Sequence, residues 1–205
     1  ADQKVLFDTL NPHPSFADVP QHVVFVGERP DGTKPFEEAD PAVDGLTEIV
    51  VLFGGELAPA SGHESEFTPL LVTGKKAGFN QFDDMVQRHM LFGLQGPVPP
   101  RQRSAVTGTN HVMGARVRAE GAPTPAPAGE GEAAEATGPK PRNLIVLGDL
   151  DLFGDQFFAM HERGGDIDGD GLDDIRFDNV TFLLNAVDSL AGDDRFVELR
   201  KRKPR

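Results

Sequence analysis

NLIVLGDLDLFGDQFF, residues 143–158, and FDNVTFLLNAVDSLAGDDRFVELRKRKPR, residues 177–205, are the two stretches that decide the fold. The first opens on an apolar run, residues 143–147, which predicts a buried β-strand ending at Gly148. The second predicts a helix over residues 179–191, with Asp178 as its N-cap and Gly192 just past its end. The apolar stripe expected to face the core consists of Val180, Leu183, Leu184, Val187 and Leu190.

Short apolar runs predict the other strands. They lie at residues 4–7, 22–26, 48–53, 67–73, 112–118 and 196–199. In the strand predicted at 48–53, residues 49–53 are continuously apolar, which is typical of a strand buried on both faces. Weaker patterns predict helices over residues 82–91 and 155–161. Together these elements predict one α/β domain over residues 1–205, a mixed-sheet sandwich with long loops.

Composition narrows the class of protein. The 205 residues include 23 Gly and 17 Pro, which indicates a folded domain with long loops. Residues 120–141 contain neither a branched aliphatic nor an aromatic side chain, so we expect a disordered insert there. The chain has no Cys, which excludes disulfides, thiolate metal sites and a cysteine nucleophile.

The charge argues against nucleic acid as a partner. The net charge is −13, and an acidic surface repels phosphate backbones. The basic end, residues 200–205, is interpreted either as a solvated terminus or as a segment leading into more chain. No apolar run reaches the roughly 20 residues that span a bilayer. Any membrane anchor is therefore expected outside these 205 residues.

An Asp-rich loop at residues 166–174 follows the spacing D-x-D-x-D-G-x-x-D. Ca²⁺ takes six to eight oxygen ligands, and alternate positions of such a loop turn their carboxylates inward. The expected ligands are Asp166, Asp168, Asp170 and Asp174 by side chain and Leu172 by its carbonyl. Phe177 stands where an EF-hand has its bidentate Glu, so a weak, structural calcium site is the hypothesis. The alternative is a solvated acidic turn.

Other polar residues also stand out as candidates for a structural or a functional role. Asp149 and Asp151 follow a predicted buried strand, where they would either cap the next turn or line a cation-binding pocket. Asn185 is expected to hydrogen-bond the backbone of a neighbouring strand. Ser61, Ser65 and His63 lie close in sequence, but closeness in sequence is not the geometry of a catalytic triad. The chain also lacks a P-loop, so any ATPase would be another chain.

The C-terminal segments resemble the gliding-motility-type ABC transporter auxiliary proteins (GldG-like). The shared pattern is an apolar strand into Gly/Ala-Asp-x-Asp, a DQF segment, DN-x-x-F-x-x-N-x-x-D-x-L-A-G-D, and L-R-x-R. Here it falls on residues 144–151, 155–157, 178–193 and 199–202. Weaker matches lie at residues 44–46, 67–74 and 113–118.

This resemblance implies a non-enzymatic accessory domain on the periplasmic, extracytoplasmic face of the inner membrane. Transmembrane segments elsewhere would tether it, and an ABC permease and ATPase would be its partners, with room for a further accessory subunit. The implied fold is similar to amidotransferase-like (flavodoxin-like) domains without their catalytic residues, and the chain would be the later part of the ectodomain. Two alternatives stay open: a free-standing calcium-dependent binding or adhesion domain, and a diverged amidotransferase-like enzyme, which the absence of Cys disfavours.

Overall fold

A computed structural model describes residues 4–13, 19–89, 93–98, 104–121, 141–164 and 176–201. The strands are β1 (Lys4–Asp8), β2 (Val23–Gly27), β3 (Glu48–Leu52), β4 (Phe67–Val72), β5 (Ala77–Gln81), β6 (Gln87–His89), β7 (Gly93–Gln95), β8 (Val112–Ala119) and β9 (Arg142–Leu147). The helices are α1 (Phe82–Met85), α2 (Asp155–Glu162), α3 (Asn179–Ala191) and α4 (Val197–Arg200). Three 3₁₀ helices are η1 (Glu64–Glu66), η2 (Asp151–Phe153) and η3 (Asp194–Phe196).

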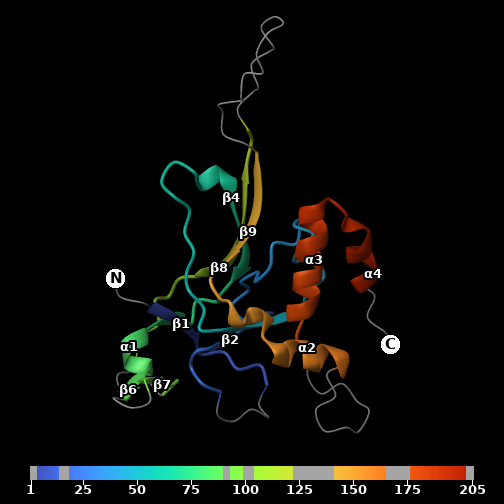
Figure 1. Ribbon diagram of the computed structural model, residues 1–205. Helices are drawn as coiled ribbons and strands as arrows, with labels where there is room; N and C mark the ends of the chain where they lie inside the picture. The colour runs from blue at the N-terminus through green and yellow to red at the C-terminus, as the bar shows by residue number, and fades with distance from the viewer. Residues whose placement is uncertain are drawn as a thin grey trace, which may run out of the picture.

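The predicted combination of helices and strands in an α/β domain is confirmed. The predicted mixed sheet is not: each pair of described strands is antiparallel, and the strands form small separate sheets. The sheets are β1-β5, β2-β3, β4-β8-β9 and β6-β7. In Figure 1 the three-stranded sheet stands upright, with α3 and α4 to one side of it and α2 below them. Backbone hydrogen bonds join the sheets: Leu6 N–H donates to Gly54 O at 2.8 Å, and Gly55 N–H donates to Gly148 O at 2.8 Å. Among the described residues, no helix has the length and apolar character needed to cross a membrane.

The β2-β3 hairpin lies between two apolar clusters. Ile49 and Val51 of β3 belong to the larger cluster, whereas Val50 belongs to a second cluster with Phe25 and Phe157. Alternate side chains of a strand point to opposite faces. The apolar run after Glu48 in β3 therefore reflects burial on both faces, as predicted.

Helix α3 has the predicted bounds but not the predicted orientation. Gly192 follows it with φ of 77°, the left-handed conformation that glycine adopts without strain. Of the predicted stripe only Val180 is buried, and Leu184, Val187 and Leu190 are 41%, 56% and 42% exposed. The buried face instead carries Asn179, Phe182, Asn185, Ala186 and Ser189. The prediction failed because it counted only apolar residues, whereas polar side chains on the inner face bind partners from distant strands.

Three further predictions are wrong. The helix expected over residues 82–91 is one turn, α1, because Val86 is extended and the chain then pairs as the β6-β7 hairpin. The strand expected at residues 196–199 is helical, beginning where the Asp193 side chain accepts a hydrogen bond from Arg195 N–H at 3.3 Å. β9 is half exposed, because in the described chain it pairs only with β8 and leaves Leu144 49% exposed.

Some predictions lie outside the described residues. They concern the insert at 120–141, of which only the ends are described, and the Asp-rich loop at 166–174. Most of the basic C-terminal end also lies outside them.

Candidate functional site

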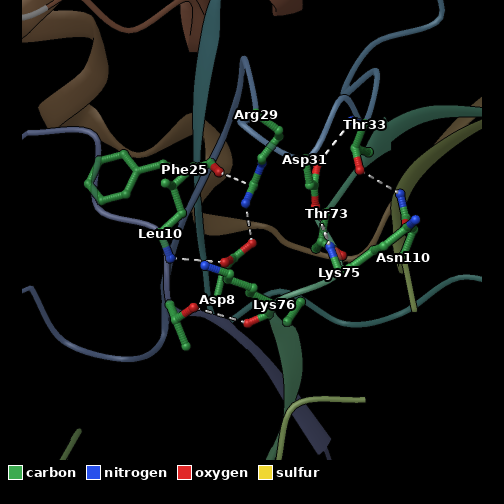
Figure 2. Close-up of polar contacts among 12 residues, drawn as sticks. Asp8, Leu10, Phe25, Arg29, Asp31, Thr33, Thr73, Lys75, Lys76 and Asn110 are labelled. Atoms are coloured by element: carbon green, nitrogen blue, oxygen red, sulfur yellow. Dashed lines mark hydrogen bonds and ion pairs between the residues drawn. The ribbon is translucent and has the colours of Figure 1, made fainter. Parts of the chain in front are cut away.

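Asp8 and Arg29 form a buried ion pair where β1 and β2 end (Figure 2). Arg29 Nη1 donates to Asp8 Oδ2 at 2.5 Å, and Nη2 donates to Phe25 O at 2.5 Å. Asp8 Oδ1 also accepts from Leu10 N–H at 3.0 Å, which turns the chain after β1. The side chains are 0% and 3% exposed, so each charge depends on the other.

Asp31 lies beside this pair on the loop after β2. Its carboxylate accepts hydrogen bonds from Thr33 N–H at 2.9 Å and from Lys75 N–H at 3.2 Å (Figure 2). The Thr33 side chain and these backbone N–H groups, with a smaller effect from the Arg29 charge, lower the pKa of Asp31 to about 2. Asp31 is therefore ionised at neutral pH.

These loops border an open cavity of about 270 Å³ that Asp8, Arg29, Asp31, Gly74 and Lys76 help to line. It is slightly smaller than the roughly 300–1,000 Å³ of pockets for drug-sized molecules. Acidic and basic residues both occur in its lining, beside Leu10 and Pro30, which suits the binding of a small molecule with polar and apolar parts. Sequence reasoning missed this site, although Asp8 follows an apolar strand in the same way as Asp149, and Asp31-Gly32 is a turn signal.

A separate series of hydrogen-bonded side chains links Glu56, His111 and Thr107. His111 Nδ1 lies 2.7 Å from Glu56 Oε1, and His111 Nε2 lies 2.6 Å from Thr107 Oγ1. The order hydroxyl, imidazole, carboxylate is that of a triad, but the same residues also hold a loop in place. Thr107 N–H donates to Ala77 O at 2.9 Å, and His111 N–H donates to Thr73 Oγ1 at 2.9 Å. We assign these three hydrogen-bonded side chains the structural role of attaching residues 105–111 to β4 and β5.

The residues predicted after β9 cap a turn. Asp149 Oδ1 accepts from Asp151 N–H at 2.8 Å, and Asp149 Oδ2 accepts from Leu52 N–H at 2.7 Å. Burial raises the pKa of Asp149, and these two hydrogen bonds oppose that effect. The capping interpretation therefore accounts for Asp149.

The helix residues singled out in the sequence are also internal anchors. Asp178 does not cap α3 through its side chain; its Oδ2 accepts from Thr47 N–H at 2.7 Å and from Thr47 Oγ1 at 2.8 Å. Asn185 Oδ1 accepts from Arg200 Nη1 at 2.9 Å, so its partner is on α4 and not on a strand. Both residues thus fasten α3 to neighbouring elements.

The remaining predicted groups do not assemble in the described residues. His63 pairs with Glu66 at 3.1 Å on the surface, and its described contacts include neither Ser61 nor Ser65. The described residues hold no group of three or more His, Cys, Asp or Glu placed to bind a metal ion. The five predicted calcium ligands, Asp166 to Asp174, lie outside the described residues.

Five large apolar side chains of the C-terminal helices are exposed. We call Leu184, Val187, Leu190, Phe196 and Leu199 the helical apolar surface; each is between 41% and 56% exposed. Phe196 and Leu199 lie on η3 and α4, which pack beside α3 (Figure 1). Several exposed large apolar side chains on neighbouring helices are a feature that interaction surfaces share.

Comparison with models of known protein families, with curated proteins and with solved structures finds no match to this chain.

Proposed function

We propose that this chain is a non-enzymatic accessory domain of a membrane-anchored, gliding-motility-type ABC transport system. In this proposal it lies on the periplasmic, extracytoplasmic face of the inner membrane, tethered by segments outside these 205 residues. It binds the permease and ATPase assembly, and its fold belongs with the flavodoxin-like, amidotransferase-like sandwiches.

One observation carries the proposal: in the stretch that resembles the family, several polar side chains are used internally while several large apolar ones are exposed. Asn179 makes three buried hydrogen bonds, to Val50 N–H at 3.0 Å, Val50 O at 2.8 Å and Leu152 O at 2.9 Å. Asp178 and Asn185 are likewise occupied by internal contacts. A catalytic stretch would keep polar groups free for substrate, whereas a docking element needs fixed anchors inside and apolar area outside.

We expect Val187→Glu to abolish recovery of an ABC permease and ATPase when the tagged native gene product is purified from its own membranes. A charge in the middle of an apolar contact must be desolvated without a partner, which costs several kcal/mol and lowers affinity by about a hundredfold or more. The measurement is mass spectrometry of the co-purified proteins, with wild type as reference.

The matched control is Leu150→Glu, because Leu150 is 95% exposed and lies outside the helical apolar surface. Leu150→Glu is expected to retain the partners, and circular dichroism should show that both variants are folded. Recovery of wild type without any ABC component would contradict the accessory role. Equal loss in both variants would contradict the assigned surface.

The calcium-dependent binding domain remains the second candidate because of the Asp spacing at residues 166–174. This loop connects α2 to α3, and Asp178 N–H at the start of α3 donates to Glu48 O at 2.7 Å. Calcium would therefore stabilise a helix start that is attached to β3.

With a dissociation constant of roughly 10⁻⁴–10⁻³ M, 10 mM Ca²⁺ should raise the unfolding midpoint by about 3–10 °C. Mg²⁺ at the same ionic strength should have a smaller effect, because it prefers to keep its water ligands. The double substitution Asp168→Asn with Asp170→Asn should remove the response. Equal melting in Ca²⁺ and in chelator rules out the site.

A further inference from the structure

The cavity at the ends of β1 and β2 carries two charges that the neighbouring ion pair does not neutralise. Asp8 and Arg29 compensate each other across 2.5 Å. Asp31 and Lys76 also line the cavity, and neither residue takes part in an ion pair within the described parts of the chain. Because the hydrogen bonds to Thr33 hold the pKa of Asp31 near 2, this carboxylate remains negative at neutral pH.

Arg29 also has hydrogen-bonding capacity to spare. A guanidinium has five N–H donors, and the described contacts of Arg29 are one to Asp8 and one to Phe25 O. Its Nε–H is buried and has no partner among the described residues. A buried donor of a charged group is costly to leave unpaired, so Arg29, which also lines the cavity, is suited to donate a further hydrogen bond to a ligand oxygen.

Gly74 leaves the cavity open between the two sites of charge. A Cβ at this position would lie 3.0 Å from Arg29 Nη1 and 3.3 Å from Asp31 Oδ2. Any other residue would therefore press on both charged groups. The backbone of Gly74 thus forms a wall that lets a ligand approach Arg29 and Asp31 together.

We propose that this cavity binds a small zwitterion of the α-amino-acid class. Its carboxylate would contact Lys76 and the free N–H groups of Arg29, and its ammonium would contact Asp31. A dianion would face the carboxylates of Asp31 and Asp8, and a simple amine would face Lys76 and Arg29. The volume of about 270 Å³ lies just below the roughly 300–1,000 Å³ of pockets for drug-sized molecules, which suits a ligand as small as an amino acid.

The test is an NMR titration of the ¹⁵N-labelled chain with an equimolar mixture of the twenty standard L-amino acids. We expect saturable shifts below about 10 mM at the amides of Asp31, Thr33, Gly74 and Lys75. A mixture of acetate and propionate, and a mixture of methylamine and ethylamine, should each bind at least about tenfold more weakly, because each lacks one of the two charges.

Asp31→Asn and Lys76→Gln should each weaken amino-acid binding by at least about tenfold. Matched controls are Glu38→Gln and Lys34→Gln, which make the same charge changes in an exposed pair outside the cavity lining. The controls should bind as wild type does. Absence of saturable shifts, equal binding of propionate, or equal weakening in the controls would each overturn the proposal. It does not depend on the accessory role, since these results are independent of partner recovery.

Discussion

Arg116→Met is expected to lower the free energy of unfolding by about 3–5 kcal/mol, because it leaves the buried Asp40 carboxylate without its partner. Arg116 lies on β8 and is 1% exposed. Its Nε and Nη2 donate to the two oxygens of Asp40 at 2.5 and 2.7 Å. Nη1 also donates to Asn143 Oδ1 at 3.0 Å, and Nη2 to Ser189 Oγ at 2.8 Å. The measurement is chemical denaturation followed by circular dichroism.

Two further variants separate the ion pair from simple loss of packing. Replacing both partners, Arg116→Met with Asp40→Leu, should cost less than Arg116→Met alone, since no buried charge is then left unpaired. Lys34→Met, in the exposed Lys34–Glu38 pair, should leave the unfolding midpoint unchanged. The loss of stability in the double variant could instead equal the sum of the losses in Arg116→Met and Asp40→Leu measured separately. That result would show that the ion pair is not the source of the effect.

Asn179→Asp is expected to be nearly as damaging, at about 3–5 kcal/mol at pH 7, although the two side chains have almost the same shape. The Asn179 Nδ2 group donates to Val50 O at 2.8 Å and to Leu152 O at 2.9 Å. A carboxylate would set negative oxygen against both carbonyls in a site that is 0% exposed. The measurement is urea denaturation of wild type and variant at several pH values.

The pH dependence distinguishes this mechanism from a general loss of structure. The unfavourable site raises the pKa of the introduced Asp in the folded state above its value in the unfolded chain. The penalty is therefore largest above that folded pKa and shrinks as the pH falls through it. Asn179→Ala should cost less at pH 7 and show no such pH dependence. A penalty for Asn179→Asp that does not change with pH would contradict the role of the two carbonyls.

Local sequence was a good guide where burial makes the residue pattern unambiguous. The strand around Ile49–Val51 is apolar at every position because both of its faces are covered, and its prediction is confirmed. The helix before Gly192 ends where predicted because a left-handed residue is needed there. The helix expected over residues 82–91 failed because strand pairing with residues 93–95, which local periodicity does not register, replaced most of it.

The candidate site was less accessible to sequence reasoning. Arg29 and Asp8 are 21 residues apart, and Lys76 is a further 47 residues along the chain from Arg29, so nothing local links their charges. Capping was one of the two interpretations offered for Asp149, because a polar residue directly after an apolar strand is a local signal. The same signal at Asp8 was present but could not identify its partner.

The sequence by itself determined the α/β class, the existence and approximate bounds of most strands, and the ends of α3, because these follow from local conformational preference and from alternation of apolar residues. Only the tertiary structure decided which face of α3 is buried. Asn179 binds Val50 across 129 residues, and Arg116 binds Ser189 across 73. Such long-range hydrogen bonds between buried polar groups outweigh the apolar stripe, since an unpaired polar group in the core costs more than an exposed leucine at the surface.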